Sequence, residues 1–320
     1  MSGGSRRAFL AGAASAAVPA LPPRPARAQP VTLTLGTATP GGGFPVYGAA
    51  FVEGLRRADP DLLVEPINTR GSTENVPRLE AGTLDLALVQ GEVVHESLSG
   101  IGRPPARLDI VTAMYPTAGM FVVRADSPVR TIADLRGKPI AWGAQGSGLV
   151  ILGRYAMDGL GLDAARDFQP VYLERAGDGP AMVLDGRVAA LWGGGAGWPG
   201  FMTMARSAPG ARFIAPDRGE IGRILDRHRF LRAVTQPAGS FPGQDQPIES
   251  VGSWSFVLSR PGLDSAIGHR LARALHRLEG MKPPPQLVDT TARNTAMVAP
   301  RERLQPGVAR YLAEIGLLPA

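Results

Sequence analysis

Short apolar runs alternate with amphipathic helical patterns along nearly all of the chain from residue 31 onward. Val31–Gly36 alternates apolar and polar residues, as a half-buried strand does. Tyr47, Phe51 and Leu55 then recur at every fourth residue, as on one face of a helix. Because repeated strand–helix units form parallel sheets wound with helices on both faces, this alternation restricts the chain to an α/β fold.

The same patterns place the remaining elements. Strands are expected at residues 31–36, 63–68, 84–90, 110–115, 120–124, 140–142, 171–173, 189–192, 212–214 and 253–258. Helices are expected at residues 45–57, 74–81, 148–159, 180–185, 199–206, 220–228, 263–279 and 306–315, and residues 131–136 carry a further helix signal with Thr131 as the cap.

Without the first 28 of its 320 residues the chain keeps about 290, a length that favours two sheets over one. We expect a first part of lobe 1 at residues 29–117, lobe 2 at residues 118–248, and a return to lobe 1 with C-terminal helices at residues 249–320. The strand pair at residues 110–124 and the strand at 253–258 would cross between the lobes.

The first 28 residues have the pattern of a signal peptide. Arg6 and Arg7 precede an apolar run at residues 8–21, and Ala26-Arg27-Ala28 has the small-x-small form of a cleavage site. The arginine pair followed by Phe-Leu resembles a twin-arginine signal. The run is too short to span ~30 Å of hydrocarbon comfortably as an anchor. We therefore expect cleavage near Ala28, a periplasmic location and a mature chain that does not span the membrane.

Net charge and cysteine content exclude several classes of protein. The formal charge is +6, and four arginines within the first 28 residues account for all but +2 of it. A near-neutral mature chain has no electrostatic footprint for nucleic acid or for an anionic membrane. The chain contains no cysteine, which excludes disulfides, zinc thiolates, iron–sulfur clusters and cysteine nucleophiles.

Four expected strands end in loops rich in glycine and serine that open the next helix. These loops are residues 36–47 (GTATPGGGFPVY), 68–75 (NTRGSTEN), 142–148 (WGAQGSG) and 192–199 (WGGGAGWP). Ligands of open α/β sheets bind beyond the carboxyl ends of the strands, where helix N-termini offer unpaired N–H groups and partial positive charge. Each loop alone is more often only a turn, but four in one chain indicate a site suited to an anion such as a carboxylate.

Candidate ligand-binding residues follow from these loops and from the strand that ends at residue 90. The set consists of Thr37, Gly42, Gly43, Phe44, Tyr47, Arg70, Ser72, Asn75, Gln90, Trp142, Ser147, Gly194 and Trp198. The backbone, hydroxyl and amide groups would hydrogen-bond the ligand, and the aromatic rings would wall the pocket. Arg70 would offer its fork of donors to a carboxylate; the alternatives are a solvated loop arginine or an interlobe salt bridge. The tryptophans could equally pack in the core.

Patterns for other chemistry are weak. The four histidines form no zincin-type pair, and no serine lies in a G-x-S-x-G sequence. Residues 195–200 (GAGWPG) match G-x-G-x-x-G, but no clear acidic partner follows on a next strand, as a dinucleotide site needs. We therefore expect no enzymatic activity, no catalytic residue, no cofactor and no bound metal.

Longer stretches around these loops resemble one known family. They are GTATPGGGFPVYG, GSTENVPRLEAGTLDLALVQ, TIADLRGKPIAWGAQGSG and the tail LQPGVARYLAEIG, and they are similar to the TAXI family, the immunogenic-protein class of solute receptors for TRAP transporters. The resemblance covers nearly the whole mature chain. It implies a two-lobed periplasmic-binding-protein fold of type II, in which each lobe is a wound, mainly parallel sheet with helices on both faces and a ligand cleft lies between the lobes.

The resemblance also implies a function. The chain would capture a small carboxylate-bearing solute, an organic acid or an amino acid, and deliver it to integral membrane subunits of a TRAP-type or ABC-type transporter. Two alternatives remain open: a periplasmic ligand-sensing module for a membrane kinase, and an enzyme on the same fold.

Overall fold

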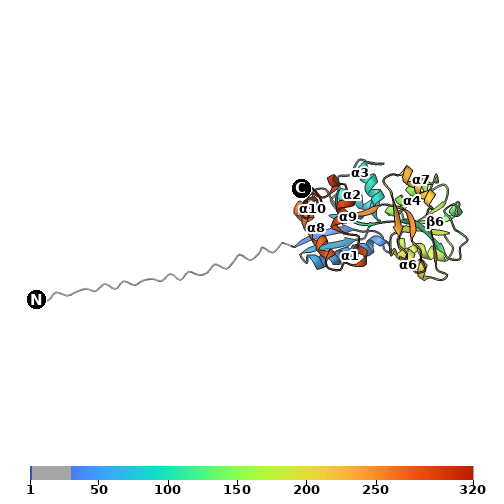
Figure 1. Ribbon diagram of the computed structural model, residues 1–320, viewed down its shortest axis with the longest axis horizontal. Coiled ribbons are helices and arrows are strands. Elements are labelled where there is room, and N and C mark those ends of the chain that lie inside the picture. The colour runs from blue at the N-terminus through green and yellow to red at the C-terminus, as the bar shows by residue number, and fades with distance from the viewer. Residues whose placement is uncertain (2–29, 320) are drawn as a thin grey trace.

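Two α/β lobes joined by crossing segments make up the part of the chain that the computed structural model describes, Met1 and residues 30–319 (Figure 1). The expected signal peptide at residues 1–28 and its cleavage site near Ala28 lie outside the described residues, apart from Met1. Within the described part, no helix is both long enough and apolar enough to cross a membrane.

The first lobe is built on a five-stranded sheet in the order β2–β1–β3–β12–β4. Its strands are β1 (Val31–Gly36), β2 (Leu62–Ile67), β3 (Leu86–Val89), β4 (Asp109–Pro116) and β12 (Trp254–Ser259). β1 pairs in parallel with β2 and β3, whereas β12 runs antiparallel between β3 and β4. The chain therefore returns late in its sequence to the middle of this sheet.

The second lobe has a five-stranded sheet in the order β7–β6–β8–β5–β9. Its strands are β5 (Gly119–Arg124), β6 (Pro139–Ala144), β7 (Gln169–Leu173), β8 (Ala190–Gly194) and β9 (Ala211–Ile214). β6 is parallel to β7 and β8, and β5 is antiparallel to β8 and β9. A separate antiparallel ribbon joins β10 (Arg232–Gln236) to β11 (Ile248–Gly252).

The expected two-lobed α/β architecture is confirmed, but each sheet is mixed where we expected mainly parallel strands. β5 and β12 are the strands that follow a crossing between the lobes. Neither is joined to its neighbours by a strand–helix–strand crossover, which is the connection that makes paired strands parallel. The residues at which one lobe gives way to the other, 117–118 and 248–249, stay a prediction.

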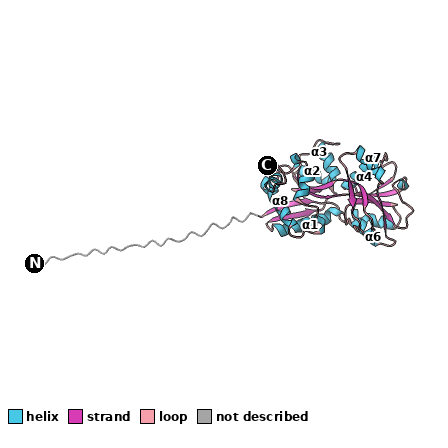
Figure 2. Cartoon of the chain, viewed as in Figure 1, coloured by secondary structure: helices cyan, strands magenta, loops and turns pink. Residues whose placement is uncertain are grey.

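Helices flank both sheets (Figure 2). They are α1 (Gly43–Ala58), α2 (Ser72–Glu80), α3 (Gly91–Ser99), α4 (Gly148–Gly159), α5 (Gly179–Leu184), α6 (Pro199–Arg206), α7 (Arg218–Arg227), α8 (Ser265–Glu279), α9 (Ala292–Val298) and α10 (Pro306–Glu314). In Figure 1, α2 and α3 lie above the first sheet and α1 below it, while α4 and α7 lie above the second sheet and α6 below it. The sequence patterns did not predict α3 and α9.

The helix predicted at residues 131–136 is instead one 3₁₀ turn, η1 (Ala133–Leu135). The Asp134 carboxylate accepts the N–H groups of Arg130 and Thr131, each at 2.9 Å. Gly137 follows with φ = 72°, a left-handed conformation that glycine adopts without a steric cost. The local turn therefore satisfies the backbone that a helix would have used.

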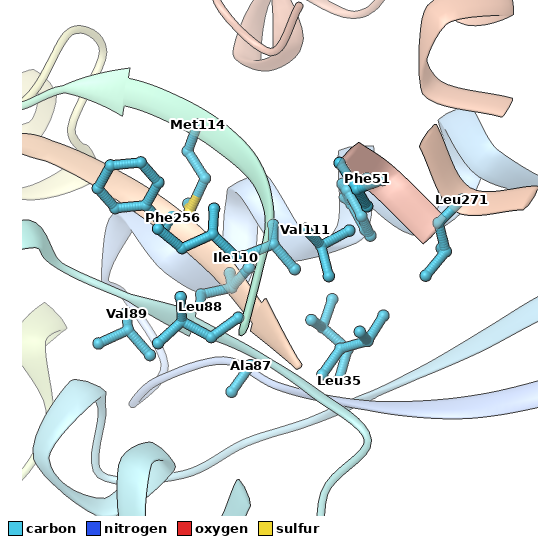
Figure 3. Close-up of a cluster of buried hydrophobic side chains, with 14 of the residues drawn as sticks. Leu35, Phe51, Ala87, Leu88, Val89, Ile110, Val111, Met114, Phe256 and Leu271 are labelled. Carbon is cyan, nitrogen blue, oxygen red and sulfur yellow. The ribbon is translucent and has the colours of Figure 1, made fainter. Parts of the chain in front are cut away.

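One hydrophobic cluster fills the first lobe. Figure 3 shows Leu35 of β1, Leu88 of β3 and Val111 of β4 together with Phe51 of α1 and Leu271 of α8. Leu35 and Phe51 are fully buried, and burial of such a side chain stabilises the fold by about 1.5–3 kcal/mol. β1 and β3, which lead to the starts of α1 and α3, are thereby fixed in place.

Two clusters cover opposite faces of the second sheet. Leu191 and Trp192 are successive residues of β8 and belong to different clusters, because neighbouring strand side chains point to opposite faces. Trp192 lies edge-on to Phe121 with ring centroids 4.7 Å apart. The ring centroids of Trp142 and Trp192 are 5.9 Å apart. Such aromatic contacts add stability beyond area burial and hold the ends of β6 and β8 rigid.

The two crossing segments lie side by side where the lobes join. The backbone N–H of Thr117, between β4 and β5, donates to the carbonyl oxygen of Ser253, between β11 and β12, at 3.1 Å. A Cβ atom at Gly252 would lie only 1.7 Å from the Thr117 carbonyl oxygen. Glycine at position 252 is therefore required for the two backbones to approach this closely.

We predict that Gly252→Ala lowers the free energy of unfolding by about 1–3 kcal/mol, since the new methyl group forces the crossing segments apart. Gly222→Ala is the matched control, because a Cβ at this position inside α7 meets nothing within 4 Å. That control should raise stability by about 0.5–1 kcal/mol. Urea denaturation of both variants tests the contact, and equal midpoints would contradict it.

Candidate functional site

A small cavity of about 50 Å³ lies between the two lobes. Both lobes contribute to its walls, which are formed by Ala38, Thr39, Gly42, Gly43, Phe44, Arg70, Gly71, Ser72, Gln90, Tyr115, Thr117, Gly143, Ala144, Ser147, Gly148, Leu149, Ala176, Gly194 and Trp198. All four glycine- and serine-rich loops reach this cavity. The four loops that the sequence predicted to bind a ligand at the strand ends therefore meet at this one cavity.

Five helices begin at the cavity wall. α1 starts at Gly43, α2 at Ser72 and α4 at Gly148, while Gln90 and Trp198 immediately precede α3 and α6. No side chain caps the first turns of α1, α2 and α3. In α2 the N–H groups of Thr73, Glu74 and Asn75 already donate to backbone carbonyl oxygens. The leading N–H groups of α1, the Ser72 N–H and the positive ends of the helix dipoles are available to an anion in the cavity.

Nine of the candidate residues line the cavity. They are Gly42, Gly43, Phe44, Arg70, Ser72, Gln90, Ser147, Gly194 and Trp198. The hydroxyl oxygen of Ser72 accepts the backbone N–H of Gln90 at 3.0 Å, and that of Ser147 accepts the N–H of Leu149 at 3.2 Å. Each hydroxyl hydrogen is left for another acceptor, because the backbone bond uses only an oxygen lone pair.

Two polar candidates, Thr37 and Asn75, lie outside the cavity wall and tie strand ends together. The Thr37 hydroxyl donates to the Ile67 carbonyl oxygen at 3.0 Å. The Asn75 side-chain amide donates to the carbonyl oxygens of Thr37 at 2.9 Å and Leu88 at 2.8 Å. Because α2 begins earlier than the expected residue 74, Asn75 faces the sheet and fixes the ends of β1 and β3.

Two aromatic candidates, Tyr47 and Trp142, also lie outside the cavity wall. Tyr47 stacks on Phe51 with ring centroids 5.9 Å apart, and its hydroxyl shares a 2.9 Å hydrogen bond with Thr290. Trp142 packs edge-on to Phe168 in the second lobe. Both side chains are 1% exposed, so they support the cavity from the cores behind it.

Tyr115 is the most informative wall residue that the sequence did not single out. It ends the strand predicted at 110–115, so the strand-end rule that located the loops could have found it. Burial raises the pKa of its phenol, which stays neutral. Within the described residues its hydroxyl has no hydrogen-bond partner, and it is available to a ligand. The other unexpected wall residues are Ala38, Thr39, Gly71, Thr117, Gly143, Ala144, Gly148, Leu149 and Ala176.

The Gln90 side chain is a buried donor without a partner. The residue is 4% exposed, and its Nε2 atom makes no hydrogen bond to any described residue. A Cβ at Gly148 would lie 2.4 Å from the Gln90 Cβ, so the start of α4 must be glycine to approach this side chain. An unpaired buried amide is costly, and an acceptor in the cavity would satisfy it.

Backbone contacts between the lobes border the cavity. The backbone N–H and hydroxyl of Thr73 in the first lobe both donate to the Gly146 carbonyl oxygen in the second, at 3.2 and 3.1 Å. The N–H of Ala176 donates to the Thr39 hydroxyl oxygen at 3.2 Å. The lobes are thus closed on each other around the wall residues.

Side chains of α3 make a second set of contacts with the other lobe. The Glu96 carboxylate pairs with Arg154 and accepts the Tyr155 hydroxyl at 2.9 Å. The His95 ring stacks on Phe230 with centroids 3.9 Å apart. These contacts lie on the helix that Gln90 precedes, so closure of the lobes and the position of Gln90 are coupled through α3.

Glu92 is a fully buried carboxyl beside the cavity residue Gln90. Its Oε1 atom accepts the Ser253 hydroxyl at 2.7 Å, and its Oε2 atom has no partner among the described residues. Burial raises the pKa of Glu92 to about 7, an effect that the Ser253 hydroxyl and the nearby Gln90 amide partly offset. A protonatable group therefore lies between the cavity and the crossing segment at residue 253.

The described residues contain no cluster of three or more histidine, aspartate or glutamate side chains that could hold a metal ion. Among the wall residues that the structure describes, Arg70 is the one with a charged side chain. The arrangement as a whole offers hydrogen-bond donors from backbone, hydroxyl, amide and guanidinium groups. Its chemistry is that of a binding site for an oxygen-rich anion.

We predict that Glu92 makes stability fall with rising pH. The unfolded carboxyl titrates near 4.5 and the folded one near 7, so between these values the folded state keeps a proton that the unfolded state has lost. The stabilisation is complete below pH 4.5 and is lost, by about 3 kcal/mol, as pH rises through 7.

Denaturation of wild type and Glu92→Gln from pH 4 to 8 measures this effect. The difference in unfolding free energy between the two should change by about 3 kcal/mol across the range. Glu65→Gln, at an exposed position on β2, is the control and should follow the wild type. Parallel curves for wild type and Glu92→Gln would show that the pKa of Glu92 is the same in the folded and unfolded states, which contradicts the prediction.

The sequence model of the NMT1-like family matches residues 35–316 of this chain. This range contains both sheets except the first residues of β1.

Solved structures share the fold. The alkanesulfonate-binding protein SsuA from Xanthomonas axonopodis pv. citri, bound to MOPS, is 21% identical, with 90% of this chain and 85% of that chain covered and a TM-score of 0.50. A structure described as a periplasmic transporter is 18% identical over 88% and 93%, with a TM-score of 0.55. A TctC solute-binding protein from Polaromonas, without ligand, is 16% identical over 92% and 100%, with a TM-score of 0.50. At these identities the likeness concerns the two-lobed fold.

Proposed function

This chain belongs to the NMT1-like family, and on that premise we propose that it is an extracytoplasmic solute-binding protein that captures a small carboxylate-bearing solute for a membrane transporter. One observation carries the proposal: five helix N-termini from two lobes meet at one cavity whose buried donor, Gln90 Nε2, makes no hydrogen bond within the described part of the chain. A carboxylate oxygen would satisfy that donor and the uncapped N–H groups together.

Closure of the lobes would trap the solute. The Thr117–Ser253 backbone bond holds the two crossing segments together, and such a paired connection is a natural hinge between lobes. The lobes would comprise residues 29–117 with 249–320, and residues 118–248. The Thr73–Gly146 contact and the Glu96–Arg154 pair would break on opening, so the solute's binding energy would favour the closed state.

The transporter type is the finer part of the proposal. The resemblance of the loop sequences to the TAXI family supports a TRAP-type partner. The fold also occurs in SsuA, an alkanesulfonate-binding protein, and an ABC-type partner is the alternative. The twin-arginine-type sequence at residues 1–28 supports export and a periplasmic location, where a solute receptor meets its transporter.

A sensing module for a membrane kinase would use the same cleft, and loss of solute uptake in a deletion strain separates the two roles. An enzyme is less well supported. Ser72 and Ser147 hold backbone N–H groups of Gln90 and Leu149, so both hydroxyls already have a role in shaping the cavity. No member of the wall, within the described chain, is a histidine, aspartate, glutamate or lysine that could serve as their base.

The proposal is tested by thermal unfolding of the mature protein, from Gln29 onward, with hydroxy acids, keto acids, dicarboxylates, amino acids and aromatic acids. Ligand at 100 times its Kd should stabilise the folded state by about 2.7 kcal/mol, a shift of several degrees. Refolding beforehand removes any co-purified solute. If no acid raises the midpoint, carboxylate capture is wrong.

We predict that Arg70→Ala weakens a bound carboxylate by more than ~10-fold, about 1.4 kcal/mol, because the wall loses its guanidinium. Isothermal titration gives the affinity of each variant. Arg166→Ala, which removes an arginine whose side chain is 87% exposed outside the cavity wall, should bind as the wild type does. Unchanged affinity in Arg70→Ala would remove Arg70 from the site.

A further inference from the structure

The described residues of the cavity wall carry a positive charge and no negative charge. Among the described wall residues Arg70 alone is charged, and its guanidinium makes no hydrogen bond or ion pair to another described residue. Only its backbone N–H is used, and this donates to Glu74 Oε2 at 3.0 Å. The described part of the wall therefore presents one unpaired positive charge and no negative one.

The unpaired polar groups of the wall, like its charge, favour a ligand that accepts hydrogen bonds. Gln90 Nε2 is a donor without a partner, and the Tyr115 hydroxyl is neutral and unpaired in the described structure. The leading N–H groups of α1 and the Ser72 N–H at the start of α2 are further donors, since no described residue accepts them. None of the described wall residues has a carboxylate that could receive an ammonium group. A group with several acceptor oxygens fits these donors, whereas a cationic group finds no counter-charge.

We propose that the solute is a monoanion, with a single acidic group and no ammonium group, so that amino acids and dicarboxylates are excluded. This inference rests on the proposed function and narrows its ligand. A buried charge needs a partner of opposite sign. One guanidinium can pair with one carboxylate, and a second carboxylate or an α-ammonium would lie in the cavity without compensation.

The length of the solute is less constrained than its charge. Arg70 also borders an outer recess of about 570 Å³, whose other lining residues are Thr73, Glu74, Gln145 and Gly146. The Glu74 carboxylate in this recess is already paired with Arg78 at 3.2 Å, and it accepts the Arg70 N–H. A neutral tail could extend past Arg70 into the recess, but an ammonium group there would compete with Arg78 for Glu74.

Two matched series of compounds test the inference by isothermal titration of the mature protein. The short series is lactate, L-alanine, malonate and lactamide; the aromatic series is mandelate, phenylglycine, phenylmalonate and mandelamide. The four compounds of each series are similar in size. In the order given, they are a monoanion, a zwitterion, a dianion and a neutral amide. In the series that binds, the hydroxy acid should bind at least about 10-fold more tightly than the other three.

Tighter or equal binding of L-alanine, phenylglycine or either dianion would overturn the monoanion inference and leave solute capture intact. Binding of the amides alone would overturn both the charge assignment and the carboxylate function. If none of the eight compounds binds, the monoanion inference is contradicted, and the thermal screen with the wider set of acids decides whether carboxylate capture stands.

The variant Arg70→Gln separates charge recognition from a structural effect. The variant should bind lactamide or mandelamide with the affinity of the wild type. Its preference for the hydroxy acid over that amide compound should fall from about 10-fold or more to near 1. An equal loss for acid and amide would mean that Arg70 only shapes the wall. An unchanged preference would mean that the charge is read elsewhere, which contradicts the inference.

Discussion

The parallel pairing of β1 with β3 and of β6 with β8 is the constraint on which the site depends. Strands that run in parallel end at the same edge, and each is followed by a helix whose N-terminus starts there. Since the two sheets bring these edges together between the lobes, the helix starts converge on one cavity. Glycine at positions 71 and 148 lets the backbones meet: a Cβ at Gly71 would lie 2.8 Å from the Gly146 carbonyl oxygen. A donor-rich cavity follows from topology before any particular side chain is considered.

Closure and binding share the same elements. α3 begins directly after the cavity donor Gln90. Its buried Glu92 accepts a hydrogen bond from Ser253 of the crossing segment, and its Glu96 pairs with Arg154 of the second lobe. A solute that bonds Gln90 would therefore act on a helix that also touches the hinge and the opposite lobe. The free energy of binding and the free energy of lobe closure are in this way physically linked.

Much of this site could be predicted from the sequence, because strand-end loops obey a local rule. The misplaced aromatics show the limits of that rule. Tyr47 lies four residues before Phe51 on the apolar face of α1, so helix periodicity already assigned it to the core. Trp142 was taken for the end of a strand, but β6 continues to Ala144, and its side chain points into the second lobe. Tyr115 reaches the cavity only because β4 leads into a crossing segment, and the insertion of β12 between β3 and β4 depends on long-range pairing that no local pattern encodes.

The most direct test of the account measures the distance between the lobes. The chain has no cysteine, so spin labels on Ala81→Cys in the first lobe and Ala165→Cys in the second, both at exposed positions, report one distance by double electron–electron resonance. With a saturating carboxylate solute, the account predicts that a broad distribution in the free protein becomes shorter and narrower as the lobes close. Identical distributions with and without the bound solute would contradict capture by closure of the two lobes.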